Sequence, residues 1–159
     1  MAKKTNQTKT LPIYILNGPN LNLLGHREPE VYGYTTLAQI EEMCATQAAS
    51  HGLSIVFRQS NREGEIVDHL QEARSGGSAV IINPAGYGHT SIAILDSIQA
   101  CGLPVIEVHL SNIHRREPYR NHSYVSKGAT GIIMGLGAQG YVRAVDAVAQ
   151  ILSAKGKKK

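Results

Sequence analysis

Two residues at the end of one apolar run have the types and the spacing that acid–base chemistry requires. In "IEVHLSN", Glu107 and His109 are two positions apart, so their side chains leave the same face of an extended strand. A carboxylate this close to an imidazole accepts a hydrogen bond from one ring nitrogen, fixes the tautomer and supports the protonated form. The pair is therefore a candidate general acid with its orienting partner. The same spacing is equally compatible with a buried pair that is only structural.

A second candidate lies in "NGPNLNLLGHREPEVYGYT", from Asn17 to Thr35. This stretch fits neither a strand nor a helix, and connections longer than about 12–15 residues without secondary structure are usually functional or disordered. It carries Arg27 and Tyr32. A free tyrosine is almost entirely neutral at physiological pH, but a neighbouring arginine favours the phenolate, which is a suitable base for a proton beside a carbonyl. Alternatively, Tyr32 only anchors the loop and Arg27 is a solvated charge.

The elements around these candidates alternate between strand and helix. Short apolar runs predict strands at 11–16, 53–59, 78–83, 103–110 and 130–135. Apolar residues that recur with a 3.6-residue period predict helices at 37–48, 66–73, 92–100 and 141–152. Thr36 with Gln39, and Ser60 with Glu63, have the pattern of capping boxes at the starts of the first two helices.

Near-continuous apolar strands that alternate with helices are typical of a parallel sheet covered on both faces. Five such units predict an α/β fold, a flavodoxin-like doubly wound single domain with strand order 2-1-3-4-5. An eight-stranded barrel needs roughly 250 residues, and this chain has 159. We expect the domain to span residues 11–153, with a disordered basic tail at 1–10 and a lysine-rich tail at 154–159.

Ligands in this architecture bind beyond the carboxyl ends of the strands, where the strand order reverses. The first predicted strand leads into the long loop, the third into "NPAGYGHTS" and the fourth into "HLSN". These three strands are neighbours in the predicted order. One pocket can therefore hold the polar residues that follow them: Asn20, Arg27, Tyr32, Asn83, His89, His109 and Ser111.

Charge and composition argue against several other classes of protein. The formal net charge is +4, but residues 11–152 hold eight Arg and one Lys against twelve acidic residues, a net charge of −3. A nucleic-acid footprint is expected on the folded domain, so no nucleic-acid partner is predicted. No apolar run approaches the length that spans a membrane, and no signal peptide is recognised at the start. A cytoplasmic protein with reduced, core Cys44 and Cys101 is expected.

Two further features of the sequence bear on ligand binding. The seven histidines show no HExxH or other metal spacing, so no metal is assigned; His114 and His122 are either lid contacts or structural residues. "GLGAQG" matches a dinucleotide fingerprint, but it follows the last predicted strand, and no acid-bearing second strand comes after it. Its glycines are expected to permit a tight strand-to-helix turn.

Together these motifs resemble the type II 3-dehydroquinate dehydratases (type II dehydroquinases). The resemblance spans about residues 11–145 and keeps the family's order and spacing. Arg115 stands where the family often has a small residue, and Tyr119 where phenylalanine is common; neither is expected to touch a residue to which chemistry is assigned. The matching segments are "NGPNLNLLGHREPEVYG", "RQSN", "IINPAGYGHTS", "PVIEVHLSNIHRRE", "YRNHSY" and "GLGAQGY".

The resemblance implies conversion of 3-dehydroquinate to 3-dehydroshikimate and water, in aromatic biosynthesis or quinate breakdown, without metal or organic cofactor, by a homododecamer built from trimers. It makes the long loop a mobile lid with Tyr32 as the base, while Arg27 stabilises the phenolate and the transition state. His109 becomes the acid, Glu107 orients it, and Asn20 helps to stabilise the enolate. The positions that match substrate contacts are Asn83, His89, Asp96, Leu110, Ser111 and Arg120.

The chemistry of such a dehydration agrees with the residues. A β-hydroxy ketone needs a base at the α-carbon, stabilisation of the enolate oxygen and an acid at the leaving hydroxyl. No lysine lies in the predicted strands, so a Schiff-base route has no candidate amine. Two alternatives stay open: a flavodoxin-like FMN carrier, which would need a phosphate-binding loop where this chain has "NGPN", and a non-catalytic ligand-binding protein.

Overall fold

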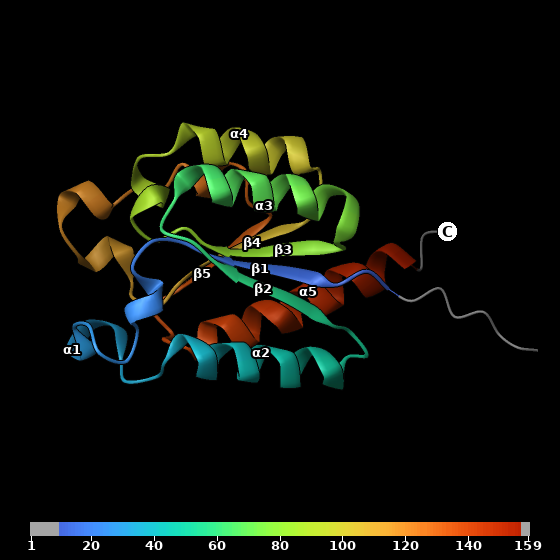
Figure 1. Ribbon diagram of the computed structural model, residues 1–159, viewed down its shortest axis with the longest axis horizontal. Helices are drawn as coiled ribbons and strands as arrows, with labels where there is room; N and C mark the ends of the chain where they lie inside the picture. The colour runs from blue at the N-terminus through green and yellow to red at the C-terminus, as the bar shows by residue number, and fades with distance from the viewer. Residues whose placement is uncertain (1–9, 157–159) are drawn as a thin grey trace, which may run out of the picture.

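Five short apolar segments form one parallel sheet in the computed structural model, which describes residues 10–156 (Figure 1). The order β2-β1-β3-β4-β5 confirms the predicted topology. Because β1 lies between β2 and β3, the chain reverses its direction of winding next to β1, and loops from neighbouring strands meet there. The strands are β1 Ile13–Asn17, β2 Ile55–Gln59, β3 Ala79–Asn83, β4 Val105–His109 and β5 Gly131–Met134.

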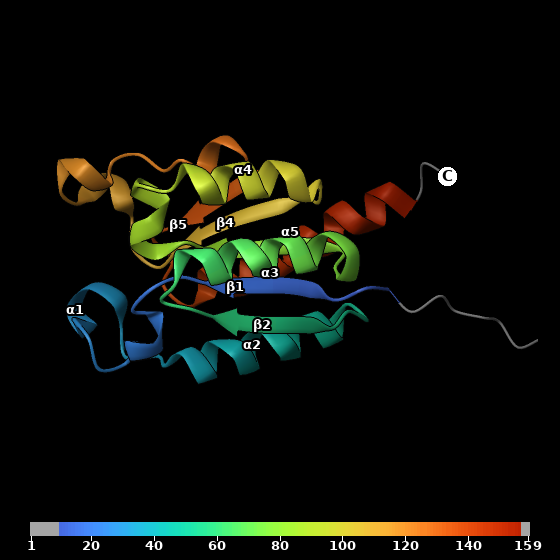
Figure 2. The same ribbon diagram turned by 45° about the horizontal axis from the view of Figure 1, so that its top comes forward.

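Helices cover both faces of this sheet, as the doubly wound prediction requires. Helices α2 (Leu37–Ser50) and α5 (Gln139–Gly156) pack on one face, and α3 (Glu63–Gly76) and α4 (Ile92–Cys101) on the other (Figures 1 and 2). The one-turn helix α1 (Pro29–Tyr32) lies beyond the carboxyl ends of the strands (Figure 2). Short 3₁₀ turns occur at Leu21–Leu23, Ala85–His89, Ile113–Arg115, Pro118–Arg120 and Val125–Lys127.

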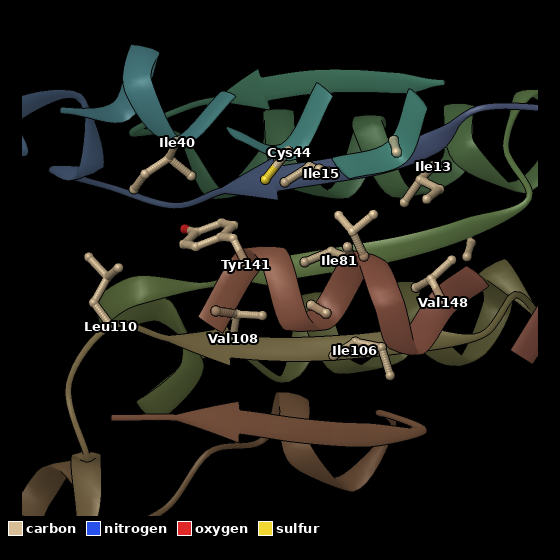
Figure 3. Close-up of a cluster of buried hydrophobic side chains, with 14 of the residues drawn as sticks. Ile13, Ile15, Ile40, Cys44, Ile81, Ile106, Val108, Leu110, Tyr141 and Val148 are labelled. Atoms are coloured by element: carbon tan, nitrogen blue, oxygen red, sulfur yellow. The ribbon is translucent and has the colours of Figure 1, made fainter. Parts of the chain in front are cut away.

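The sheet separates two apolar clusters because successive strand side chains point to opposite faces. Ile13 and Ile15 belong to the cluster under α2 and α5, which Figure 3 shows, whereas Tyr14 and Leu16 belong to the cluster under α3 and α4. Cys44 and Cys101 are buried in these clusters as free thiols, as predicted. Burial raises the pKa of Cys44 to about 12, so its thiol stays protonated and packs as a small apolar group.

Only one of the two predicted capping boxes forms. The Gln39 N–H donates to Thr36 Oγ1 (3.2 Å), and the Thr36 N–H donates to the Gln39 side chain (2.9 Å), which confirms the first. The second prediction is wrong, because α3 begins at Glu63, so that Glu65 occupies the third helical position. Ser60 accordingly donates to Glu65 (2.5 Å) and accepts a hydrogen bond from the backbone N–H of the residue before the helix.

Most element ends shift by a few residues from their predicted positions, and two segments differ further. The long loop 17–35 was expected to be irregular, but it contains the 3₁₀ turn at Leu21–Leu23 and α1, which has a proline at its start, where a missing N–H costs least. Helix α5 continues to Gly156, past the predicted domain end at 153. Residues 1–9 and 157–159 of the predicted tails lie outside the described residues. Within residues 10–156, no helix is both long and apolar enough to cross a membrane.

The glycine-rich turn before α5 behaves as predicted. Gly135 and Gly137 have φ angles of 85° and 57°, which residues with a side chain rarely adopt. The turn brings the start of α5 against the sheet, where Tyr141 is fully buried. These glycines therefore set the strand-to-helix geometry at the end of β5.

Candidate active site

A cavity of about 170 Å³ lies at the carboxyl ends of β1, β3 and β4, where the sequence predicted a pocket. Nine of the predicted site residues line it: Asn20, Arg27, Tyr32, Asn83, His89, His109, Leu110, Ser111 and Arg120. Two predicted residues do not. Glu107 lies behind His109, which it contacts directly, and Asp96 is exposed on α4, outside this chain's own cavity.

The carboxyl end of β4 holds a buried acid–base pair. Glu107 is fully buried and its Oε1 is 2.6 Å from His109 Nε2, which leaves His109 Nδ1 as the nitrogen available to the cavity. Ser126 donates a hydrogen bond to the other carboxylate oxygen. Burial by itself would raise the pKa of the Glu107 carboxyl, but the hydrogen bonds with His109 and Ser126 outweigh it and hold this pKa below its ordinary value. Glu107 is therefore a carboxylate that orients the ring of His109.

His89 is fixed by reciprocal hydrogen bonds with His122. His89 Nδ1 is 2.6 Å from the His122 carbonyl, and His122 Nε2 is 2.9 Å from the His89 carbonyl. Burial and the nearby charges of His109, Arg120 and His122 lower the pKa of His89 and favour its neutral form. Because a carbonyl only accepts, the single proton of a neutral His89 must be on Nδ1. His89 therefore presents Nε2 to the cavity as an acceptor, and His122 is a structural partner.

Two arginines lie near Tyr32 in the segment 17–35, which the resemblance implies is a lid. Its ring packs against the apolar cluster of α2 and α5, and its hydroxyl accepts a hydrogen bond from Arg116 Nη1 (3.0 Å). The guanidinium carbons of Arg116 and Arg27 lie 5.4 and 5.8 Å from the ring centroid. Arg27 forms an ion pair with Glu28 (3.3 Å). Arg27 was the expected partner of the Tyr32 oxygen, but among the described residues the hydrogen bond comes from Arg116.

Asn20 is held in a backbone conformation that few residues other than glycine adopt. Its φ of 67° lies in the left-handed region, and its backbone N–H donates to Asn61 Oδ1 (2.9 Å). The Asn61 carbonyl in turn accepts a hydrogen bond from Tyr87. Two more non-glycine residues have positive φ: Glu28 in the lid and Ala85 in the cavity wall. Strained backbone of this kind is common at functional sites.

Positive charge dominates the cavity. Among the described residues that line it are three arginines, Arg27, Arg116 and Arg120, and no Asp or Glu. Glu117 holds the Arg120 side chain from outside (2.9 Å). The Arg120 guanidinium also lies 5.3 Å from the ring centroid of Tyr119, so Tyr119 packs beside a position that was expected to contact substrate. The arrangement suits a small anionic ligand with several oxygen atoms.

Sequence reasoning missed three residues of this site, Arg116, Asn61 and Ser126, whereas His122 has the structural role that was one of its two expected readings. Arg116 stands in "IHRRE" beside Arg115, and Asn61 ends "RQSN", but neither segment has a periodicity that indicates which side chain turns inward. Within residues 10–156, no group of three or more His, Cys, Asp or Glu side chains is arranged to hold a metal ion. The absence of a cofactor stays a prediction.

Comparison with known proteins places this geometry in a family. The family model described as dehydroquinase class II matches residues 11–149. A 3-dehydroquinate dehydratase from Streptomyces coelicolor is 58% identical over 144 residues, covering 90% of this chain and 92% of that protein. One from Streptomyces avermitilis is 59% identical over 149 residues, covering 91% and 94%.

Solved structures agree with the sequence relatives. The crystal structure of a type II dehydroquinase from Propionibacterium acnes has a TM-score of 0.85 and 40% identity, covering 89% of this chain and 97% of that one. A 3-dehydroquinate dehydratase-like protein from Bifidobacterium longum has a TM-score of 0.68 and 31% identity, covering 91% and 99%. With its five-stranded order, its cavity and these relatives, the chain belongs to the class II dehydroquinase family.

Proposed function

We propose that this protein dehydrates 3-dehydroquinate to 3-dehydroshikimate through an enolate, with Tyr32 as the base and His109 as the acid. The observation that carries the proposal is that the two groups, on the lid and on β4, line one cavity. The relatives named 3-dehydroquinate dehydratase, which match nearly the whole chain, supply the substrate.

The first step is removal of the proton beside the ketone. Tyr32 in its phenolate form accepts this proton, and the positive charge of Arg116, in contact with the hydroxyl oxygen, favours that form. Arg27 adds positive charge near the ring. The electrons left on carbon move to the carbonyl oxygen, giving an enolate. Asn20, whose strained backbone fixes its place in the cavity wall, stabilises that oxygen, directly or through water.

The second step is loss of the hydroxyl group. The enolate re-forms the ketone and expels the β-hydroxyl, which leaves as water after it takes a proton from His109. Glu107 prepares His109 for this step, because a buried carboxylate at 2.6 Å fixes the orientation of the ring and balances the positive charge that it carries before the transfer. The product is the conjugated enone.

The remaining wall fits the rest of the substrate. 3-Dehydroquinate carries a carboxylate and several hydroxyls. Arg120 supplies a positive charge, and His89 supplies an acceptor for a hydroxyl proton. Asn83, Ser111 and the Leu110 backbone complete the proposed contacts. A carboxylate in this cavity would meet no acidic side chain among the described lining residues.

The proposed assembly is a homododecamer built from trimers. Asp96 is exposed on α4 and lies outside its own chain's cavity. If it contacts substrate, as the family resemblance implies, a second copy of the chain must supply it. Light scattering should then give a mass near twelve times the 17.1 kDa chain. A monodisperse monomer with full activity would contradict the assembly but leave the reaction standing.

A direct assay tests the reaction. Purified protein treated with a chelator should form the conjugated enone of 3-dehydroshikimate from 3-dehydroquinate, followed by its ultraviolet absorbance. Borohydride added with substrate should trap no covalent adduct, because the proposed route has no amine nucleophile. Lack of turnover would reject the function, and a trapped adduct or chelator-sensitive activity would reject the mechanism. A flavin-bearing protein would support the FMN-carrier alternative, which the family match disfavours.

A further inference from the structure

Behind the cavity, a hydrogen-bonded relay joins α5 to the ends of β1 and β3. Tyr141 extends from α5 under the sheet, with its hydroxyl toward the carboxyl ends of the strands (Figure 3). The hydroxyl donates to Asn17 Oδ1 (2.7 Å) and accepts from Asn83 Nδ2 (2.9 Å). Tyr141 is fully buried and does not itself line the cavity, and its hydrogen bond with Asn83 joins it to a residue that does.

The two ends of this relay are backbone groups whose polarity cannot change. At one end Asn17 Nδ2 donates to the carbonyl of Arg58 (3.0 Å), and a carbonyl only accepts. At the other end the N–H of Ala85 donates to Asn83 Oδ1 (3.1 Å), and a backbone N–H only donates. Burial raises the pKa of Tyr141 well above its ordinary value, so its hydroxyl keeps its proton at any working pH.

The polarity of every group between these ends follows. Since Asn17 Nδ2 faces the Arg58 carbonyl, its Oδ1 faces Tyr141 and takes the one proton that the hydroxyl can donate. The Tyr141 oxygen is then left as an acceptor and requires an N–H from Asn83. The Asn83 amide oxygen is occupied by Ala85. Each amide nitrogen has one more N–H, and of the two residues only Asn83 lines the cavity, so the second N–H of Asn83 is the one available to a ligand.

We infer that Tyr141 is a positioning residue that locks the Asn83 amide so that it presents a hydrogen-bond donor, and not an acceptor, to the ligand. The inference rests on the proposed function for the identity of that ligand. It predicts that the group held by Asn83 uses an oxygen lone pair. The relay also disfavours the flipped orientation of the Asn83 amide. In that orientation two N–H groups would face each other at Ala85, and two lone pairs would face each other at Tyr141.

The same relay holds the strained turn after β3. Ala85 has a φ of 50°, and its N–H is fixed by Asn83. Loss of the Tyr141 hydroxyl would leave Asn83 held by this one bond. The amide would then sample orientations in which its oxygen faces the cavity, which would weaken ligand binding without removing any group that touches the ligand.

A double-mutant cycle tests the inference. Tyr141→Phe, which keeps the ring, should raise KM for 3-dehydroquinate roughly 3- to 10-fold, the effect of one hydrogen bond, and change kcat less than about twofold. Asn83→Ala should raise KM at least as much. In Asn83→Ala, adding Tyr141→Phe should change KM no further, because Tyr141 acts only through Asn83. Equal KM effects of Tyr141→Phe with and without Asn83 would overturn the inference.

A matched control separates positioning from packing. Tyr14 is a second buried tyrosine, whose hydroxyl donates to Glu72 (3.1 Å) in the other apolar cluster. Tyr14→Phe removes a hydroxyl in the same way and should leave KM unchanged. If Tyr141→Phe does not fold, Asn17→Ala takes its place, because it interrupts the relay one step earlier. Asn17→Ala should raise KM in the wild-type background and should not raise it further in Asn83→Ala.

Failure of the proposed function gives a different result from failure of the relay. If wild-type protein does not turn over 3-dehydroquinate, the function falls, and crystal structures of wild type and Tyr141→Phe still decide the relay. The Asn83 amide should keep its contact with Ala85 in the wild type and should shift or split between orientations in the variant. An unchanged, single Asn83 position in Tyr141→Phe would overturn the inference.

Discussion

Arg116 donates a hydrogen bond through Nη1 to the hydroxyl of Tyr32, 84 residues earlier in the chain, over a distance of 3.0 Å. The same nitrogen is 3.5 Å from Ser111 Oγ, and the Arg116 side chain is 17% exposed. Arg27, by contrast, is 41% exposed and paired with Glu28. The contact ties the segment of Tyr32 to the segment after β4, and it puts a positive charge beside the oxygen that we propose as the base.

Replacing Arg116 should therefore impair the chemistry more than binding. Arg116→Ala removes the charge next to the Tyr32 oxygen, and we expect kcat to fall by about 10²-fold or more. Arg116→Lys keeps a charge without the planar fork and should recover part of the loss. The adjacent, exposed Arg115 provides the control, because Arg115→Ala should stay within twofold. An Arg116→Ala enzyme with normal kcat would show that this contact only holds the lid.

Tyr32→Phe tests the base directly. The ring stays packed while the hydroxyl is lost, so a substrate analogue should still bind and kcat should fall by orders of magnitude. Tyr34→Phe, in the same segment but 80% exposed, should behave as wild type. Steady-state kinetics and calorimetric binding measure the two effects. Near-normal turnover by Tyr32→Phe would mean that another group accepts the proton.

Glu107→Gln should show whether the charge of Glu107, and not only its size, matters for the proposed acid His109. The amide keeps the size of the buried side chain but cannot support a charged His109, so kcat should fall about 10²- to 10⁴-fold. The lowered pKa of Glu107 also makes a signed prediction for stability. Its carboxylate stabilises the fold above its ordinary pKa of 4.5, and this contribution is lost as pH falls through the lower folded value. Thermal melts of wild type and variant should therefore converge in acid; a difference that grows in acid would contradict this.

Gly18→Ala should distort the junction of the two cavity loops. A Cβ there would lie 2.3 Å from the carbonyl oxygen of Pro84, so the backbone must move. We expect a loss of about 1–3 kcal/mol in the free energy of unfolding, together with a raised KM. Gly86→Ala, where a Cβ meets nothing within 4 Å, is the matched control and should unfold within about 0.5 kcal/mol of wild type. Similar denaturant midpoints for the two variants would refute the close approach.

Asp146 joins α5 to α2, and its contribution to the free energy of unfolding should depend on pH. The hydrogen bond from His51 (2.8 Å), with further ones from Gln47 and Arg143, lowers the pKa of Asp146. A lowered carboxyl pKa stabilises the fold above its ordinary value of 3.8 and loses this effect as pH falls below it. Asp146→Asn should cost about 0.5–1 kcal/mol at pH 7, and this cost should shrink as pH falls below 3.8 and through the lower folded pKa, whereas exposed Glu41→Gln should have no effect. A pH-independent difference would assign the cost to packing.

The sequence by itself determined the fold and most of the cavity wall. The five apolar runs and the helical periods are local patterns, and five alternating units leave few ways to cover both faces of a parallel sheet. The carboxyl ends of the strands then meet at one edge of the sheet. The sequence alone could therefore predict that Asn83 and His109 lie in one pocket. The Thr36 capping box was equally predictable, because its bonds run only three residues along the chain.

Tertiary structure decided the contacts between segments that no spacing relates. Ser60 bonded Glu65 and not Glu63 because the start of α3 was set by packing. Arg116, not Arg27, reached the Tyr32 oxygen because the turns after β4 aim its side chain across the lid. Asp96 carries its carboxylate away from its own chain's cavity because the face of α4 on which it lies is exposed. The Tyr141 relay needs three elements at once; hydrogen-bond partners are chosen by distance and direction in space, and sequence records neither.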